Sequence, residues 1–273
     1  MSDIKLLRFK IYQPHAHYRI PFTYQRRHTY PIPPYSTVVG FLCNLLGYWD
    51  KMPAEIDEMK KLKISIAGRF DCKTTEFLWF RNLSKKAHLA RFGTIENRYV
   101  AGHIEHIGGQ FPMTIDTLND VRLVIHLAHE DERFLDTIRQ SLENPVRRLE
   151  PLHLGRAEDW IVLEHPPELC DLNRFEVRRE DGNYGHFFWI PQNLWVPESL
   201  VKPSSFRDFD GLLYRITSLW TVENYASTLN RHGRRTFNYI TAKLSDGSFN
   251  GKFFLFDNDW QLPVFLADLG DEA

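Results

Sequence analysis

The sequence predicts an α+β fold built mainly of strands, and two observations carry this prediction. In the first 165 residues, short apolar segments follow one another in the order strand, helix, strand, strand, helix, strand. The remainder, from about residue 171, is mostly strand-like. The spacing of apolar residues separates helices from strands, because side chains return to the same face about every 3.6 residues in a helix and every second residue in a strand.

The first strand and the first helix are the best defined elements of the N-terminal half. Residues 4–13 show partial alternation of apolar and polar positions, which is typical of a strand. After a polar loop, an apolar helix is predicted over residues 37–48. Ser36 or Thr37 is suited to cap the start of this helix, and Gly47 is suited to end it.

Shorter segments complete the order of elements. They are predicted at 53–61 (helical), 62–70 and 75–80 (strands), 120–128 (strand), 131–142 (helix) and 160–163 (strand). The core order is that of the ferredoxin-like, or RNA-recognition-motif, arrangement.

We expect one core with an insertion and an extension. Residues 1–170 are assigned to the ferredoxin-like core and residues 171–273 to a β-rich C-terminal extension. Within the core, the stretch of about 82–112 has little apolar periodicity, several cations and five Gly or Pro residues, which indicates a long excursion. In the extension, the best strands are expected at 212–220, 236–244 and 252–256, with a hairpin turn at 257–259.

Composition places the chain among globular proteins with a sizeable core. Hydrophobic residues make up 43% of the chain and aromatic residues 14%. There is no run of 18 apolar residues and no apolar signal-peptide segment at the N-terminus, so we expect a cytoplasmic protein without a membrane span. The three cysteines lack metal-ligand spacing, and we expect neither a metal nor another cofactor.

Charge is segregated along the chain although the net charge is only −1. Residues 4–49, 77–95 and 224–245 contain no Asp or Glu but carry several cations, whereas residues 128–183 hold 14 acidic residues against 8 arginines and no lysine. This pattern predicts a cationic face, suited to a polyanion, and an acidic face.

Three sequence features together resemble one protein family. They are the strand at 4–13, the entry Thr29-Tyr30-Pro31-x-Pro33-Pro34-x-Ser36-Thr37-x-x-Gly40, and the turn Leu154-Gly155-Arg156-Ala157-Glu158-Asp159. On these features the chain resembles the CRISPR-associated protein five family, which belongs to the RAMP superfamily and supplies subunits of type I Cascade complexes. Tyr35 departs from the pattern, where another proline is expected. Length and general character favour a type I-B-like member.

The resemblance implies a function and a set of partners. It implies a non-catalytic subunit that binds the repeat-derived 5′ handle of CRISPR RNA and caps one end of the Cascade backbone. The partners would be the backbone subunit and the large subunit that inspects target DNA. The excursion at about 82–112 would correspond to the family's thumb, a hairpin that presses on the RNA and on the neighbouring backbone subunit.

The entry to the first helix supplies the first candidate RNA-binding residues. Ser36 and Thr37 could bind a phosphate through backbone N–H groups at the helix tip, or could simply cap the helix. Tyr30 could stack on a base or could belong to the core. Arg26 and Arg27 lie in an acid-free loop and are predicted to contact phosphate.

Further candidates lie in the thumb and beyond it. Lys85, Lys86, Arg91 and Arg98 fit a thumb that follows an RNA backbone. His103 and His106 are two imidazoles three residues apart, which is only part of a metal site, so RNA contact or hydrogen bonding is favoured. Arg156 could contact RNA or could pair with Glu158 or Asp159 to fix its turn, and Arg234 could face RNA or a neighbouring subunit.

Two alternative functions remain open from the sequence. Relatives in type I-C systems cleave repeat RNA without a metal, using a Tyr with an adjacent Lys and His; here Ala87 separates Lys86 from His88. In a strand these two side chains would still share a face. The other alternative is a protein–protein scaffold, for which the acidic stretch 128–183 and the aromatic residues of 184–195 would supply surfaces.

Overall fold

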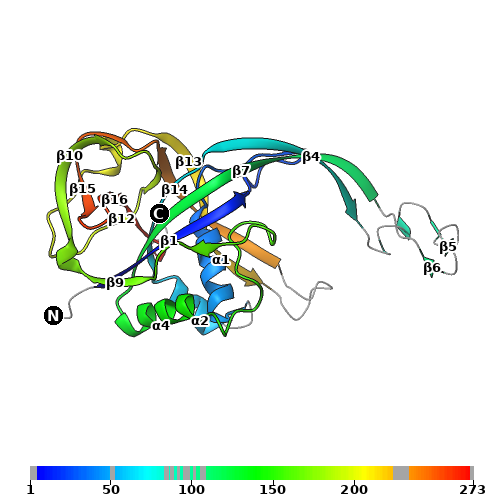
Figure 1. Cartoon of the computed structure of the whole chain (residues 1–273), viewed down its shortest axis with the longest axis horizontal. Coiled ribbons are helices and arrows are strands. Elements are labelled where there is room, and N and C mark those ends of the chain that lie inside the picture. Colours follow the sequence, from blue (N-terminus) through cyan, green and yellow to red (C-terminus); the bar gives the residue numbers. More distant parts are fainter. Residues whose placement is uncertain are drawn as a thin grey trace.

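The computed structural model describes residues 5–49, 53–82, 86, 89–90, 93–94, 99–100, 103–104, 109–223 and 234–270. These residues form a large sheet, mostly antiparallel, with helices on one face and a small second sheet on the other (Figure 1). The mixture of many strands with few helices agrees with the α+β prediction.

The N-terminal elements lie close to their predicted positions. They are β1 (Lys5–Ala16), β2 (Arg26–Arg27), α1 (Tyr35–Leu46), α2 (Pro53–Met59), β3 (Lys63–Arg69), β4 (Cys72–Asn82), β5 (Tyr99–Val100), β6 (His103–Ile104), β7 (Gly109–Ala128), α4 (Glu132–Glu143), β8 (Val162–Leu163) and β9 (Glu168–Asp171). The C-terminal strands are β10 (Phe175–Asn183), β11 (Phe187–Pro191), β12 (Leu194–Trp195), β13 (Leu212–Glu223), β14 (Arg234–Ser245), β15 (Ser248–Asp257), β16 (Leu262–Val264) and β17 (Leu266–Asp268).

The observed helix α1 begins and ends two residues before the predicted range 37–48, although Gly47 ends it as expected. Gly47 follows the helix in the left-handed conformation, at φ 78°, as its lack of a Cβ allows. The N-cap is Pro34, which offers no side-chain hydrogen bond, and the helix already begins at Tyr35. Neither Ser36 nor Thr37 therefore caps the helix, because both lie inside its first turn.

The main sheet joins the two halves of the chain. Its strands follow the order β13-β14-β11-β3-β7-β1-β8, and β1 pairs with β7 over most of its length. The C-terminal strands β11, β13 and β14 continue the sheet beyond β3, whereas β10, β15 and β16 form the separate three-stranded sheet. Residues 171–273 thus contribute to both sheets.

Alternation along β1 assigns each face of the main sheet to a different layer. Leu7, Phe9 and Ile11 belong to the core that also contains the apolar residues of α1 and α4. Leu6 faces the opposite way and packs in the cluster that includes Phe175 from the small sheet. Because successive strand residues point to opposite faces, β1 is buried on both sides.

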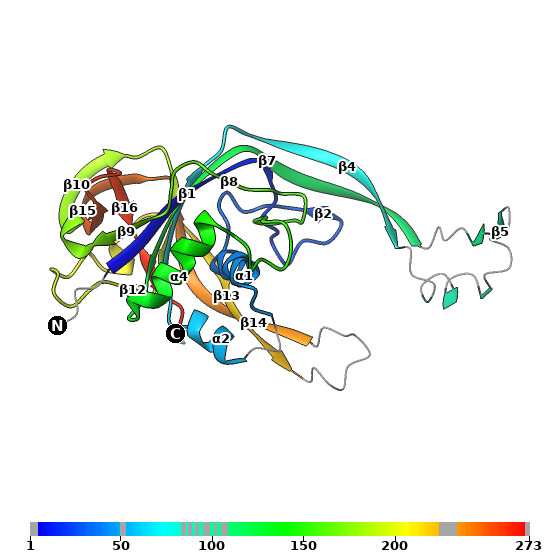
Figure 2. The same ribbon diagram turned by 60° about the horizontal axis from the view of Figure 1, so that its bottom comes forward.

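Strands β4 and β7 extend beyond the sheet as a two-stranded arm (Figures 1 and 2). Their pairing runs from Cys72 opposite Asn119 to Asn82 opposite Gly109. The arm thus begins before the predicted excursion at about 82–112, most of which lies outside the described residues. Among the described helices, none combines the length and apolarity needed to cross a bilayer.

A buried ion network links β1 to the C-terminal hairpin. The Arg8 guanidinium is 2% exposed and donates two hydrogen bonds to Asp257, which is fully buried, at 2.7 and 2.9 Å. His126 on β7 donates to the same carboxylate at 2.9 Å. Glu168 and Asp259 accept further hydrogen bonds from Arg8, so the buried charge is compensated.

This network should make the protein sensitive to the loss of one carboxylate. We expect Asp257→Ala to lower the free energy of unfolding by about 3–5 kcal/mol, because it leaves the buried Arg8 with only the two partly exposed acids. Glu143→Ala is the matched control: it breaks the exposed pair with Arg139 and should cost less than about 1 kcal/mol. Urea unfolding measures both, and equal costs would contradict this role of the network.

The same network predicts loss of stability in acid. Although burial alone would raise the pKa of Asp257, the hydrogen bonds from His126 and Arg8 hold it well below the ordinary value of 3.8. Burial lowers the pKa of His126 below the ordinary 6.5. Since both folded-state pKa values are depressed, stability should fall as the pH drops below about 6.5 and again below about 3.8. A free energy of unfolding that rises on acidification would contradict the assignment.

Candidate functional site

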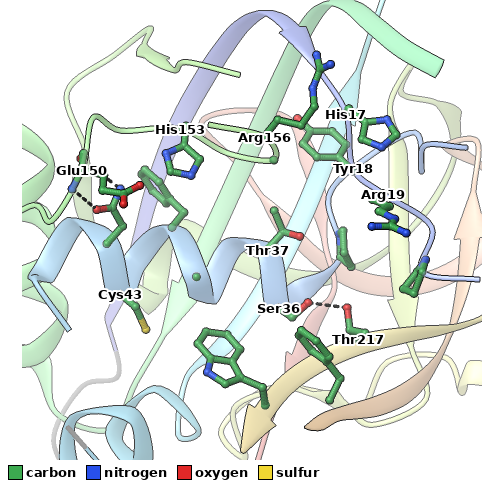
Figure 3. A pocket seen from close by; sticks show the side chains of 18 of the residues that line it. His17, Tyr18, Arg19, Ser36, Thr37, Cys43, Glu150, His153, Arg156 and Thr217 are labelled. Atoms are coloured by element: carbon green, nitrogen blue, oxygen red, sulfur yellow. Dashed lines mark hydrogen bonds between the residues drawn. The ribbon is translucent and has the colours of Figure 1, made fainter. Parts of the chain in front are cut away.

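A groove of about 780 Å³ runs along α1 (Figure 3). One wall comes from the loop that follows β1 and from β2. The other elements around it are the 153–156 loop and β13. Four residues predicted from the sequence line the groove: Arg27, Ser36, Thr37 and Arg156.

The start of α1 forms the floor of this groove, but it does not present the predicted helix tip. The N–H of Thr37 donates to the carbonyl of Pro34 at 3.0 Å, so it is already used within the helix. Ser36 is buried, and its hydroxyl lies 2.5 Å from that of Thr217 on β13. The Thr37 N–H is thus not a free donor, phosphate binding by Ser36 and Thr37 stays a prediction, and Thr37 lines the groove with a half-buried side chain.

A buried carboxylate shapes the Gly155-Arg156 turn. Asp159 accepts hydrogen bonds from the N–H groups of His17 and Arg156 and from the Arg156 guanidinium, at 2.8–2.9 Å for the shortest contact of each. Although burial alone would lower the pKa of Arg156, the bonds to Asp159 raise it. Of the two roles left open by the sequence, the structural one is observed, and RNA contact by Arg156 stays a prediction. Arg156 pairs with Asp159 and still lines the groove.

Two arginines of the same wall have no such partner. No carboxylate of the described residues lies within ion-pair distance of Arg19 or Arg27, although both line the groove. Burial lowers the pKa of Arg27, and the neighbouring charge of Arg19 lowers it further. The Arg27 guanidinium lies over the Phe80 ring at 5.4 Å, and its Nε is buried without a hydrogen-bond partner. Arg19 and Arg27 are thus two neighbouring cations that no carboxylate of the described residues compensates at ion-pair distance.

A second buried carboxylate anchors the base of the arm beside the groove. Asp116 on β7 accepts hydrogen bonds from His28 and Thr75 at 2.8 and 3.0 Å. Lys73 and Arg26 lie at 3.4 and 3.6 Å from its oxygens. Although burial alone would raise the pKa of Asp116, His28 and the other donors lower it. Arg26 is thus directed toward Asp116, whereas its neighbour Arg27 reaches the groove.

Tyr30 is placed in the core rather than on the surface. It is 3% exposed, and its ring packs edge-to-face against Trp189 and Tyr214 at 5.7 and 5.8 Å. The prediction that Tyr30 stacks on a base is wrong for this conformation, because no face of the ring is free. The core role, the other possibility from the sequence, is the one observed.

The remaining predicted residues are not brought together with the groove by the described structure. Lys86 is exposed, Arg234 opens β14 and His103 opens β6, while Lys85, Arg91, Arg98 and His106 lie outside the described residues. Within the described part of the chain, no three His, Cys, Asp or Glu side chains are grouped so that they could hold a metal ion.

Among the polar residues of the groove, His17 was missed by the sequence reasoning, whereas Arg19 lies in the basic loop 19–28 that was expected to bind RNA but was not named as a candidate residue. Both follow directly after β1, where the chain leaves the sheet beside α1. Arg19 belongs to the acid-free segment 4–49 and could have been found from that signal. His17 had no signal, because its role depends on contacts with Asp116 and Asp159, about a hundred residues away or more in the sequence.

Comparison with known proteins identifies the family. Residues 6–249 match the family model described as "CRISPR-associated protein (Cas_Cas5)". The chain belongs to the Cas5 family. This confirms the resemblance inferred from the strand, the proline-rich entry and the Gly155-Arg156 turn. No curated protein matches the chain in sequence.

Solved structures show a similar fold at low sequence identity. A chain described as "CRISPR RNA-guided surveillance complex" is similar with a TM-score of 0.51 and 12% identity, over 89% of each chain. A structure described as "Crystal structure of Cas protein" has a TM-score of 0.44 and 14% identity, over 88% of this chain and 93% of the other. The first likeness supports the Cas5 fold, and the second is too weak to add to it.

The Gly155 turn offers a test of the groove geometry. Gly155 has φ +114°, and a Cβ there would lie 2.7 Å from Asp159 Oδ2 and 3.0 Å from the His17 carbonyl. Gly185→Ala is the matched control, since Gly185 also has a positive φ (+62°) but has nothing within 4 Å. We expect Gly155→Ala to cost at least about 1 kcal/mol more in urea unfolding than Gly185→Ala. Equal losses would mean that Asp159 does not fix the turn.

Proposed function

We propose that this Cas5 protein binds the 5′ handle of CRISPR RNA in the groove along α1. The observation that carries the proposal is the pair Arg19 and Arg27, which both line the groove and have no carboxylate of the described residues within ion-pair distance, although Glu150 also lines the groove. Phosphate is the anion that repeats along a nucleic acid, and arginine forks bind it well.

The groove also suits a single strand better than a duplex. It contains exposed aromatic residues beside the cations, namely Trp49 and Phe237, which are 48% and 40% exposed. Unpaired bases stack on such surfaces while phosphates meet cations, and this combination is typical of single-strand binding. Arg27 lying over Phe80 extends the same combination onto the arm.

We propose further that the protein works as a subunit of a Cascade surveillance complex. The similar chain of known fold is described as a CRISPR RNA-guided surveillance complex, which supports this assignment. The arm favours a protein partner, because Phe77 and Trp79 are 64% and 60% exposed with their rings 6.0 Å apart. The proposed partners are the backbone subunit and the large subunit of the complex, with target DNA near them. The proposed subtype is type I-B-like.

We also propose that four strands of the main sheet, in the order β8-β1-β7-β3, form the ferredoxin-like core of the family together with α1 and α4. The strand order and the antiparallel pairing of β1 with β7 and β8, and of β7 with β3, support it. The protein itself is proposed to be non-catalytic, since the family's catalytic Lys and His are adjacent, whereas Ala87 separates Lys86 from His88 here.

The handle-binding proposal predicts a specific effect of two neutralised arginines. In fluorescence anisotropy with single-stranded handle RNA, Arg19→Ala/Arg27→Ala should weaken binding by about tenfold and reduce the slope of log K against log salt by about 1.4. Lys60→Ala/Lys61→Ala, which removes two cations paired with Asp57 and Glu58, is the control and should leave both unchanged. Unchanged affinity in the arginine variant would favour the scaffold function.

Catalysis is tested separately with the repeat RNA. Purified protein incubated with repeat RNA in EDTA should give no site-specific product, because metal-independent cleavage needs a convergent base and acid. A specific product that disappears in Lys86→Ala or His88→Ala would establish an endoribonuclease and contradict the non-catalytic assignment.

A further inference from the structure

His17 is a buried histidine that lines the groove and is not accounted for by the contacts described so far. It follows the end of β1 and is only 4% exposed. Its Nδ1 lies 2.7 Å from the carbonyl oxygen of Asp116, and its backbone N–H donates to Asp159. These two contacts, from β7 and from the Gly155 turn, fix the position of the imidazole.

The Asp116 carbonyl determines which nitrogen of His17 carries the proton. A carbonyl oxygen accepts hydrogen bonds and cannot donate one, so Nδ1 must be protonated. In the neutral ring, Nε2 then carries a lone pair and can only accept. Nε2 is buried and has no hydrogen-bond partner. A buried acceptor without a partner is costly, and such groups in native proteins often meet a ligand.

The surroundings of His17 favour the neutral ring at physiological pH. Burial lowers its pKa below the ordinary value, and the charges of Arg156 and Arg27 lower it further; the carbonyl of Asp116 and the charge of Asp159 oppose them only in part. A neutral Nε2 repels phosphate oxygens, which are acceptors too. The ligand group that suits it is a hydroxyl or another N–H or O–H donor.

We propose that Nε2 of His17 accepts a hydrogen bond from a ribose 2′-hydroxyl, and that this contact makes the groove select RNA over DNA. The inference rests on the proposed binding of a single strand in this groove. A 2′-hydroxyl is the group that distinguishes RNA from DNA at a given contact. The neighbouring cations Arg19 and Arg27 would hold the phosphate of the same nucleotide.

Binding must uncover Nε2, which is buried in the chain alone, and we extend the proposal to Arg27, which lines the same groove, as the residue that moves. Arg27 is near enough to influence the pKa of His17, yet no carboxylate of the described chain holds it. Arg156, by contrast, is tied to Asp159 by its backbone N–H and its guanidinium. A phosphate that draws Arg27 toward itself would thus open the side of the groove at His17 while the Gly155 turn stays in place.

A walk of single 2′-fluoro substitutions along the handle RNA tests the proposal in the wild-type chain. Fluorine keeps the RNA sugar pucker but removes the O–H donor. We expect one position at which the substitution weakens binding by about fivefold, the worth of one hydrogen bond, with small effects elsewhere. If no position in the walk weakens binding, the proposal is overturned whatever any variant does.

Two substitutions of His17 separate its two nitrogens. His17→Asn places an amide near the position of Nδ1, so it keeps the donor to Asp116 and lacks an acceptor at the Nε2 position. His17→Gln places its amide near the position of Nε2. We expect the loss of RNA affinity caused by the 2′-fluoro substitution to fall to less than about twofold in His17→Asn and to persist in His17→Gln. Thermal melting checks that both variants are folded.

The outcomes distinguish this inference from the function on which it rests. If Arg19→Ala/Arg27→Ala loses RNA binding, the handle-binding function is retained. If the 2′-fluoro substitution still weakens RNA binding as much in a folded His17→Asn variant as in the wild-type chain, the role of His17 is overturned. RNA and DNA of the same sequence bound equally by the wild-type chain would also overturn that role. If the wild-type chain binds neither RNA nor DNA, the handle-binding function fails first.

Discussion

The structure depends on a simple electrostatic constraint: each positive charge brought into or beside the core must be met by a carboxylate. Arg8 is met by Asp257, and Arg156 by Asp159. In each pair the acid is fully or almost fully buried, so neither member could be left alone without a large cost. These pairs join distant parts of the chain, and they position the walls of the groove. Arg19 and Arg27 depart from this pattern, since no carboxylate of the described residues lies within ion-pair distance of them, and this departure supports the proposed binding of RNA phosphate.

This constraint connects the fold with the proposed function. Asp159 holds the Gly155 turn against the end of β1, and Asp116 holds the base of the arm against β2 and the following loop. Both carboxylates belong to segments that reach the same side of α1. The buried carboxylates therefore hold the backbone of the groove walls in place, so a ligand can be bound without folding the site first, and only the Arg27 side chain has to move.

The sequence predicted the elements better than the site. Strands and helices with a clear period, such as β1 and α4, were placed within a few residues because local pattern decides them. The acid-free segment 4–49 was a weaker guide. Lys5 and Arg8 form ion pairs with Glu132 and Asp257, which are far away in the sequence. A segment without acidic residues can therefore still have acidic neighbours in the folded chain. Tyr30 shows the same limit, since only the position of β11 and β13 places Trp189 and Tyr214 around it. Membership of the Cas5 family was recognised because its motifs are local.

The most direct test of handle binding in the groove is photocrosslinking. Handle RNA with 5-iodouridine at successive positions would be bound to the full-length chain, irradiated and digested, and the crosslinked peptides identified by mass spectrometry. The account predicts crosslinks to peptides that contain residues 17–37 and 153–156, with none to α4. Crosslinks confined to α4 or to the small sheet of β10, β15 and β16 would contradict it.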